Sequence, residues 1–598
     1  YEPVGNPERE TAEWTANRDT IKDEILNLGS MSRFNQTSKL NYTIPINKLP
    51  LLDWVTSNAS YTGSYRWTAS SRSTQSIMGN VSENEAMIQF NANGDLSKLY
   101  NKVPYFKTIT TPKRTNNSRN SRQPSKEESV DTTAVSSKKN YGKMVGDGAL
   151  KLLLSVKKVS FTYSQTSGVS LPGYMYEPDY IGLNALTGAP GIGFVMGWND
   201  DALNNAINGN WLTTDTTFNQ AYSERYNESY NYKVVLEPFQ DFKIDVTGTR
   251  TYVENFSEYF RADADGVFNF YTPTNGGNFS MSYLMTATSF KDGDELFENL
   301  LDNRLDIANR LAYENEAWVG LGSPMVYDSI GCGFYPYGYG ASSQEVLLYS
   351  FLAAYTGQTP DNVGLTMFKK FALPNWTINF GGLTRIPALK KIFKTINLTH
   401  SYRSNYAIST WASNINYVED NPMALYEGTN NRVPEYDMAQ IVVSEQYAPL
   451  IGVTLAFNNN FSPSFEFKKS RAVTLSFINN QLTEVEGREI IIGCGYTFQD
   501  LGILITSMGG NTSRKVNDLV LKLDIGFRKD KTTLRSIDEN YSQISSGQNR
   551  INIYLTADYD FSSRLGMQAF FKRDVTDPFV ANSFKTSNTF AGITLRFS

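Results

Sequence analysis

The clearest pattern in this chain is an alternation of apolar and polar residues in its C-terminal third. From Leu519 to Phe527 every odd-numbered residue is apolar, while the even-numbered residues include Lys522 and Asp524. The same alternation recurs over the segments 490–498, 551–561, 565–571 and 591–597. A period of two places the two sets of side chains on opposite faces of a β-strand. We therefore predict a run of strands that each have one apolar and one polar face.

The predicted strands are longer than those of most soluble sheets. They span roughly 9 to 12 residues, whereas soluble strands usually span about 5 to 6, and the greater length suits a tilted strand that crosses a bilayer. In a soluble sheet the apolar face would meet a core. In a transmembrane barrel it would face lipid, and the polar face would meet water inside. The alternation alone is compatible with both environments.

The connections between these strands differ in length. "DFSSR" at 560–564 predicts a tight turn, whereas the polar stretches 529–549 and 574–588 predict long loops. The stretch 499–516 is also long and departs from the regular order of turns and loops. Outer-membrane barrels have short periplasmic turns and long loops outside the cell. The loop lengths therefore predict that the last strand runs from outside to the periplasm, where the C-terminus lies.

Three other segments lack this strand pattern. "DELFENLLDNRLDIANRLA" at 294–312 and "SQEVLLYSFLAAYT" at 343–356 predict helices, the second after a capping box of Ser342 and Glu345 and before Gly357. We expect both to be loop insertions that rest on the barrel mouth, with a gating role as an open alternative. The charged, Ser- and Asn-rich stretch 112–140 has no periodicity and predicts a disordered polar loop.

Composition narrows the choice of protein class. Aromatic residues make up 13% of the 598 residues, and no apolar run reaches the roughly 18 to 20 residues of a membrane helix. A soluble chain of this length should divide into several domains, yet no boundary is visible. The formal net charge of −5 argues against a nucleic acid as the main partner. Aromatic richness favours a barrel, and a multidomain adhesin of β-sandwiches remains an alternative.

Few residues suggest catalytic chemistry. The single histidine, His400, lies in a predicted strand without a nucleophile motif beside it, so we expect no enzymatic activity and no cofactor or metal. Cys332 and Cys494 have no metal-ligand spacing, and the sequence leaves open whether they are bonded to each other or free.

The charged residues on the polar face of the predicted strands are the candidate functional residues. Their mixed signs fit a wide aqueous conduit better than a selective ion pore, which would favour one sign. Their simplest alternative role is a hydrated wall. The candidates that we expect to face the lumen are Lys522, Asp524, Arg528, Asp558, Asp560, Lys572 and Arg596.

Several long motifs resemble a known family. They are "YTIPINKLPLLDWVTSNASYTGSYRWTAS", "LYNKVPYF", "YGYGASSQEVLLYSFLAAYTG", "LPNWTINFGGLTRIPALKKIFKTINLTHSYRS", "SEQYAPLIGVTLAF" and "EFKKSRAVTLSFINNQLTE". These stretches are similar to the SprA/Sov family, the outer-membrane translocon of the type IX secretion system in Bacteroidetes-type bacteria. The resemblance runs from about Trp14 to Ser598 and matches the C-terminal part of that family. Because family members are several times longer, we expect this chain to be a C-terminal fragment.

The resemblance implies a fold and a function. We expect an all-β, antiparallel transmembrane β-barrel, here an open half-barrel of about 16 to 20 tilted strands with unpaired edges and a few short helices in loops. The implied function is a protein-conducting channel in the outer membrane that passes folded proteins to the surface and supports gliding motility. The implied partners are secreted proteins with a type IX C-terminal signal, a PorV-type barrel, a periplasmic plug protein and outer-membrane lipid. A TonB-type or lipopolysaccharide-type transporter is the alternative within the barrel class.

Overall fold

The computed structural model describes residues 31–71, 74–106, 154–198, 200–506, 512–562, 565–580 and 583–597, together with Arg18 and Lys22. The predicted polar loop 112–140 lies outside these residues. The strands are β1 (Arg33–Ile44), β2 (Val55–Thr68), β3 (Asn80–Asp95), β4 (Val156–Tyr174), β5 (Ala221–Phe239), β6 (Phe242–Ala262), β7 (Phe268–Ser282), β8 (Met325–Asp328), β9 (Gly333–Pro336), β10 (Asn375–Phe380), β11 (Phe393–Ser413), β12 (Tyr436–Phe457), β13 (Phe461–Ser476), β14 (Gln481–Thr506), β15 (Thr512–Ser536), β16 (Tyr541–Ser562), β17 (Leu565–Pro578) and β18 (Thr586–Phe597). The helices are η1 (Pro45–Lys48), α2 (Gln75–Met78), α3 (Leu96–Lys102), α6 (Ile192–Met196), α7 (Ala202–Asn208), α8 (Gly293–Tyr313), α9 (Glu316–Gly320), α10 (Gln344–Thr356), η2 (Gly382–Arg385) and α11 (Pro387–Lys390).

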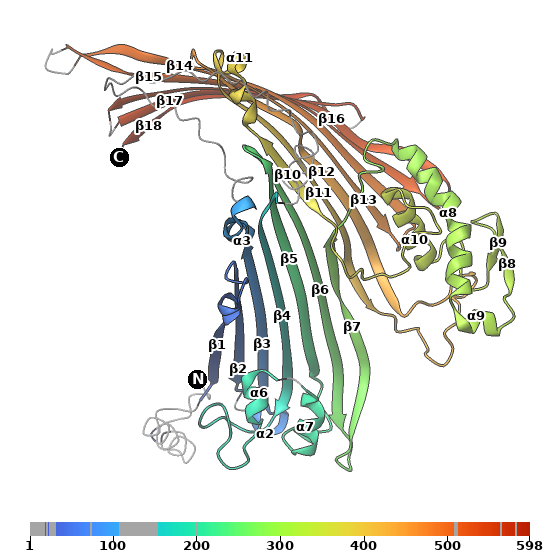
Figure 1. Cartoon of the computed structure of the whole chain (residues 1–598). Helices are drawn as coiled ribbons and strands as arrows, with labels where there is room; N and C mark the ends of the chain where they lie inside the picture. Colours follow the sequence, from blue (N-terminus) through green and yellow to red (C-terminus); the bar gives the residue numbers. More distant parts are fainter. Residues whose placement is uncertain are drawn as a thin grey trace, which may run out of the picture.

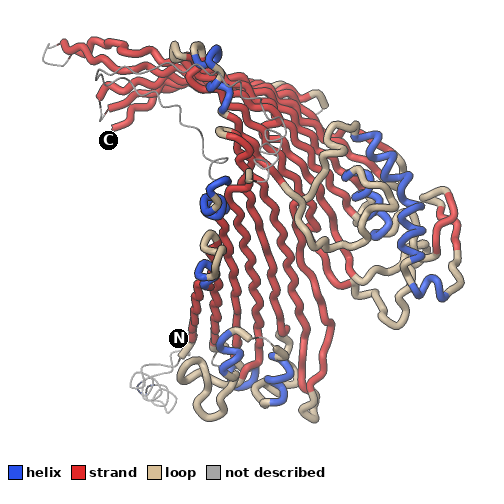
Figure 2. The backbone as a smooth tube through the Cα atoms, viewed as in Figure 1, coloured by secondary structure: helices blue, strands red, loops and turns tan. Residues whose placement is uncertain are grey.

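One antiparallel sheet of 16 strands forms the body of the chain, strongly twisted and curved (Figures 1 and 2). Its strands follow chain order from β1 to β18, and only β8 and β9 form a separate hairpin. Among the described residues, β1 pairs with β2 alone and β18 with β17 alone, so the sheet is open at both edges. The expected antiparallel all-β fold and number of strands are confirmed. None of the helices among the described residues is long and apolar enough to cross a membrane.

A large insertion divides one strand of the sheet into two halves. β7 pairs with β6 as far as Met281, opposite Arg250, and β10 continues beside β6 from Asn375, opposite Thr247. On the other side both strands pair with β11. β7 and β10 are therefore two halves of one strand, and residues 283–374 between them form a separate unit, hereafter the insertion.

The strands are longer than predicted. Within the 16-stranded sheet, the strands other than β10, with 6 residues, span from 12 residues in β1 to 26 in β14. The predicted loop 529–549 is wrong, because β15 continues to Ser536 and β16 begins at Tyr541. The predicted loop 574–588 shortens to the interval between Pro578 and Thr586, and 499–516 belongs largely to β14 and β15. Polar residues on both faces resembled a loop in the sequence, but the backbone ladder extends through them.

The predicted separation of short turns and long loops between the two rims is also wrong. We call the end of the sheet where β18 stops the C-terminal rim, and the opposite end the insertion rim. The long connections 175–220 and 414–435 lie at the insertion rim, but residues 96–155 connect the end of β3 to the start of β4, and both of these strand ends lie at the C-terminal rim. The tight turn predicted at 560–564 agrees with strands that end at Ser562 and resume at Leu565.

Both predicted helices are present in the insertion. α8 is capped by Asp292, whose side chain accepts a hydrogen bond from the backbone N–H of Asp294. The cap of α10 is Ser343 rather than the predicted Ser342, and the helix ends at Gly357 in the left-handed conformation, as predicted. Residues 346–356 of α10 are all buried, because a helix that is apolar all round must be covered on every side.

Candidate functional site: the two faces of the sheet

The register of the strands assigns every side chain to one of two faces. Residues directly opposite each other in an antiparallel pair share a face. Leu523 lies opposite Cys494 on β14 and Leu555 on β16, and Leu555 lies opposite Phe571 on β17. We call the face that carries these residues the apolar-band face, and the opposite one the polar face.

The apolar-band face exposes large side chains near the C-terminal rim. Ile492 is 50% exposed, Ile593 69% and Leu595 53%. Other large apolar residues of this face that are at least one third exposed are Ile451, Phe465, Ile490, Tyr496, Phe498, Phe527, Ile551, Leu555, Phe571 and Phe597. Soluble proteins rarely expose a continuous apolar area of this extent, so the band marks a surface that meets lipid or another apolar partner.

All seven sequence-predicted residues lie on the polar face. Asp524 is opposite Tyr554, Tyr554 is opposite Lys572, and the other candidates share their parity along β15 to β18. Several are neutralised by near neighbours. Arg596 Nη2 lies 3.3 Å from a carboxylate oxygen of Asp560, and Lys572 Nζ lies 3.1 Å from one of Asp574. Arg528 pairs with Asp530 at 2.9 Å, and the Asp558 carboxylate accepts a 2.7 Å hydrogen bond from Gln568.

A hollow of about 780 Å³ lies on the polar face between β13 and β17. Asp524, Arg528 and Lys572 line it, together with charged residues that the sequence analysis missed, namely Glu466, Glu489 and Arg550. Glu466 and Glu489 belong to the same alternation on β13 and β14, so their parity could have identified them. Acids and bases alternate here at short range, which gives a hydrated surface without a single dominant sign.

The insertion packs on the apolar-band face at the insertion rim, and not on the polar face. β15 pairs with β14 without a register shift between Leu519 and Ser536, so Leu523 and Arg535 point to the same side. Arg535 Nη2 lies 2.7 Å from an Asp294 carboxylate oxygen at the start of α8. Figure 1 shows α8 and α10 beside the ends of β12 and β13. The two helices therefore lie at the insertion rim, on the apolar-band face of the sheet.

Two buried ion pairs lie under the insertion. Arg471 on β13 pairs with Glu445 on β12 at 3.0 Å, and Arg535 on β15 pairs with Glu484 on β14 at 2.9 Å. Each of these four side chains is at most 3% exposed. Arg471 also donates to the Thr288 hydroxyl in the insertion at 3.0 Å. These charges lie on the same face as the apolar band, but protein rather than lipid covers them.

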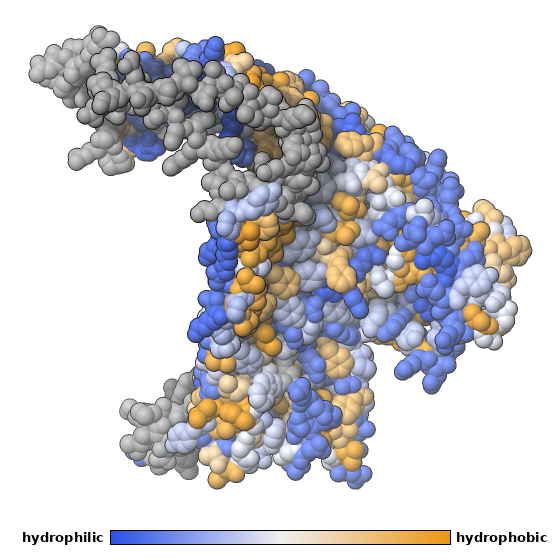
Figure 3. All heavy atoms as spheres, viewed as in Figure 1, coloured by the Kyte–Doolittle hydropathy of each residue, from blue (hydrophilic) through white to orange (hydrophobic). Residues whose placement is uncertain are grey.

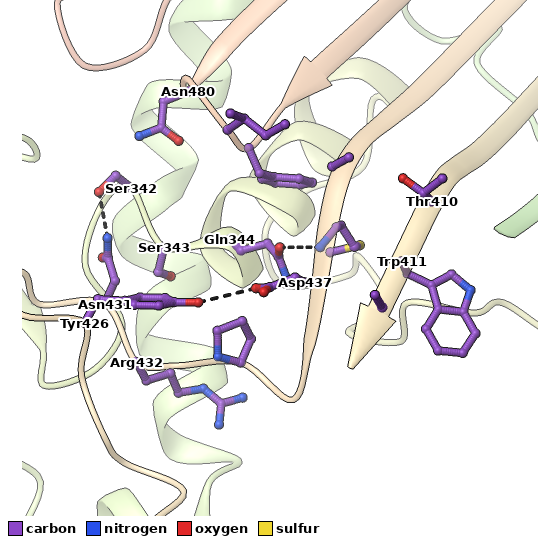
Figure 4. A pocket seen from close by; sticks show the side chains of 16 residues that line it. Ser342, Ser343, Gln344, Thr410, Trp411, Tyr426, Asn431, Arg432, Asp437 and Asn480 are labelled. Carbon is purple, nitrogen blue, oxygen red and sulfur yellow. Dashed lines mark hydrogen bonds between the residues drawn. The ribbon is translucent and has the colours of Figure 1, made fainter. Parts of the chain in front are cut away.

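A pocket of about 560 Å³ opens where the insertion meets the loop between β11 and β12 (Figure 4). Arg432 forms a two-point contact with Glu345, with both N–O distances at 2.7 Å. Burial tends to lower the pKa of the Arg432 guanidinium, but the nearby Glu345 carboxylate holds that pKa above its ordinary value. The Asp437 carboxylate accepts hydrogen bonds from Tyr426 and Asn414. These groups satisfy one another, so the pocket is a structural junction.

The remaining sequence candidates take simple structural roles. His400 lies on β11, with Nδ1 2.7 Å from the Leu450 carbonyl oxygen. Cys332 and Cys494 are both free, the first exposed in the insertion and the second half-buried within the apolar band.

Comparisons with known proteins give only distant structural similarities. No protein-family model matches it, and no curated protein is similar to it in sequence. Among solved structures, the RagAB peptide importer in its open-open state matches at 7% identity and a TM-score of 0.29, over 92% of this chain and 50% of that one. The copper transporter OprC matches at 6% identity and 0.25, over 95% and 64%. The siderophore receptor PirA from Acinetobacter baumannii matches at 8% and 0.22, over 95% and 72%.

These structural neighbours are named as transporters and receptors, and the likeness is low. This chain spans about half the length of the RagAB chains. The peptides, copper and siderophores in their names belong to those proteins.

Proposed function

We propose that this chain forms part of the wall of a protein-conducting barrel in the bacterial outer membrane, the translocon of a type IX secretion system. The observation that carries the membrane part is the two-faced sheet. From β12 to β18 one face exposes a continuous apolar band, and the opposite face is charged and hydrated. Lipid on one side and water on the other explains both surfaces at once. A sandwich adhesin would need a second sheet over the apolar face, and the described residues contain no such sheet.

The size of the sheet supports a wide conduit. Closed barrels of 16 to 18 strands already enclose an aqueous channel. This sheet has 16 strands and is open at both edges, so closure needs further strands from the same or another chain. The resulting pore would be wider than that of a porin, as a folded cargo requires. Its polar face is rich in Ser, Thr and Asn with charges of both signs, which binds no single class of solute strongly.

The secretory assignment rests on the sequence motifs that resemble the SprA/Sov family. In this proposal the apolar band faces outer-membrane lipid, and Lys522, Asp524, Arg528, Asp558, Asp560, Lys572 and Arg596 face the lumen. The insertion rim lies outside the cell, so that the C-terminus is periplasmic. The cargo would be proteins with a type IX C-terminal signal, and a PorV-type barrel and a periplasmic plug protein would complete the machine. Gliding motility would then depend on it through secreted adhesins.

The position of the insertion indicates which parts of the assembly could open and close the conduit. It packs on the face that carries the apolar band, so α8 and α10 do not cover the polar face. Opening and closing of the conduit would therefore depend on other parts of the assembly.

Depletion of the protein in its native host tests the proposal. We expect proteins with the type IX signal to disappear from the medium and cell surface and to accumulate in the periplasm, as measured by quantitative proteomics of each fraction. Re-expression of the full-length protein should restore secretion. An unchanged secreted proteome combined with lost uptake of a nutrient would contradict the translocon and favour an importer.

A further inference from the structure

The insertion exposes an unusual cluster of large apolar side chains far from the apolar band. Tyr313 is 71% exposed, Tyr327 60% and Phe334 64%, and Val319, Leu321 and Met325 are also exposed. We call these six residues the hairpin patch, because β8 and β9 form its centre. In Figure 3 apolar spheres gather at the tip of the insertion, where Figure 1 places β8 and β9. Exposed apolar patches of this kind mark interaction sites in folded proteins.

Buried residues beneath the hairpin patch hold its backbone in place. Trp318 is 1% exposed, and its indole N–H donates to the Pro324 carbonyl oxygen at 3.2 Å. The Asp328 side chain, at the end of β8, accepts backbone hydrogen bonds from Ile330, Gly331 and Ala341 at 2.8 to 3.1 Å. Rigid support lowers the entropy cost of binding, because little of the site must be ordered when a partner arrives.

The two central aromatic residues are pre-arranged for contact. Tyr327 lies opposite Phe334 in the hairpin, and their rings meet edge to face at 5.7 Å. On the next residue of β9, Tyr335 points inward and is 4% exposed. The hairpin thus uses one face to join the insertion and presents the other, with its aromatic side chains, to the surroundings. Aromatic anchors of this type dominate the energy of protein interfaces.

Acidic side chains line the helix that leads to the patch. Glu298, Asp302 and Asp306 on α8, together with Glu314 and Glu316 near its end, are all exposed. The structure shows no ion pair for any of these five within its described residues. The nearby bases do not compensate them, because Arg304 is buried and Arg310 donates to backbone carbonyl oxygens at Pro360 and Val363. In Figure 3 hydrophilic spheres cover α8 beside the apolar tip.

This charge pattern selects among possible occupants. Phosphate groups of a lipid surface would be repelled by the uncompensated carboxylates of Glu314 and Glu316 at the edge of the patch, and a second copy of this chain would present the same acids. A protein surface with basic residues around an apolar centre complements both parts of the patch. We propose that the hairpin patch is a docking surface for a partner protein whose contact segment has apolar residues flanked by Lys or Arg. This inference does not depend on what the wall conducts.

Site-specific photo-crosslinking in cells tests the proposal. Phe334 of the full-length protein is replaced by the photo-crosslinking residue p-benzoylphenylalanine, and Ile415, which is 80% exposed in the loop after β11, serves as the control position. We expect one discrete protein adduct from position 334 and none of that mass from position 415. Mass spectrometry of the crosslinked peptide should show apolar residues with Lys or Arg close by in its sequence.

Charge reversal adds a second measurement. The triple variant Asp306→Lys, Glu314→Lys, Glu316→Lys should reduce the adduct yield from position 334 by roughly tenfold, because rim charges set encounter and specificity. Asp361→Lys, which reverses an exposed acid in the loop after α10, should leave the yield unchanged. Limited proteolysis of the purified variants should give the cleavage pattern of the wild type, which checks that they retain the hairpin.

Four results of the crosslinking experiment would contradict the docking surface. An adduct with lipid only, an adduct with a second copy, a crosslinked segment that is acidic, or no adduct at all would each overturn the proposal. Retention of secretion alongside a lost adduct would leave the translocon intact and show that the two proposals stand separately.

Discussion

The two ends of the long strands β12 to β15 present the same face to different surroundings. Toward the C-terminal rim this face carries exposed residues such as Tyr496 and Phe498. Near the insertion rim it carries the buried pairs Arg471–Glu445 and Arg535–Glu484. β14 pairs with the whole of β13 and with β15 from Leu482 to Phe498 without a register shift, so the backbone does not cause the difference there. The kinds of residue differ because their surroundings differ. In the part of the chain that the structure describes, the apolar band has no hydrogen-bond partners for a charge, whereas the insertion supplies such partners at the other end.

This comparison teaches where a charge can lie on the wall. Burial of an ion pair is compatible with folding only when both partners and their remaining hydrogen bonds are in place. Thr288 and Ser289 of the insertion supply part of these bonds, since Thr288 accepts from Arg471 and Ser289 donates to Glu445 at 2.5 Å, whereas Nε and Nη1 of Arg471 have no hydrogen-bond partner within the described ranges. The apolar band has no such cover among the described residues, and its side chains are correspondingly uncharged. Changes at the two ends should therefore fail for different reasons.

The largest effect is expected from Arg471→Leu. The substitution leaves the Glu445 carboxylate buried without its cation, which costs about 3 to 5 kcal/mol in stability. We expect a lower melting temperature of the purified protein in detergent and earlier proteolytic release of the insertion. The double variant Arg471→Leu, Glu445→Leu should recover most of the loss. If the double variant is no more stable than the single one, the pair is not the cause.

A somewhat smaller effect is expected from Leu523→Arg at the other end. An arginine on a lipid face near mid-bilayer costs about 2 to 4 kcal/mol. We expect a reduced amount of assembled protein in the outer membrane, measured by fractionation and heat-modifiable gel mobility. Leu523→Ile keeps the residue apolar and should assemble like the wild type. Normal assembly of Leu523→Arg would contradict a lipid-facing band.

The two native thiols sharpen the comparison without any substitution. Cys332 is exposed on the insertion, whereas Cys494 lies opposite Leu523 within the apolar band. In intact outer membranes a water-soluble maleimide should modify Cys332 and leave Cys494 unmodified until detergent is added. Equal modification of both before detergent would show that water reaches the band.

The smallest effect is expected from Asp524→Arg, the neighbour of Leu523 on the opposite face. Its side chain is exposed and lines the polar hollow, so a change of sign there should alter stability by no more than about 0.5 kcal/mol. Assembly and melting temperature should match the wild type. A loss comparable to that of Leu523→Arg would mean that position 524 is not in water.

The sequence predicted the two faces well because lipid and water sort side chains by parity wherever a strand is exposed on both sides. Strand ends could not be predicted from this signal, since residues 529–536 and 541–549 are largely polar on either side and so resembled a loop. The helices of the insertion were recognisable from their apolar spacing. Which face they cover follows from the register that links Leu523 to Arg535 and from long-range contacts such as Arg535–Asp294, which local patterns do not encode.

The candidate site was predictable in part for the same reason. The seven charged residues follow the parity of strands whose apolar partners were obvious. Glu466 and Glu489 follow it too, but they lie on strands with a less regular alternation and were missed. The buried pairs under the insertion were not predictable, because an arginine at position 471 or 535 resembles any exposed strand residue until its cover is known.

Single-cysteine labelling at positions 523 and 524 tests the two-faced wall most directly. Both variants are made in full-length protein that carries Cys332→Ser and Cys494→Ser, and intact outer membranes are treated with a water-soluble maleimide. We predict rapid labelling at 524 and protection at 523 that detergent removes. Equal labelling at both positions, or faster labelling at 523, would contradict the membrane-spanning wall and remove the physical basis for the proposed translocon.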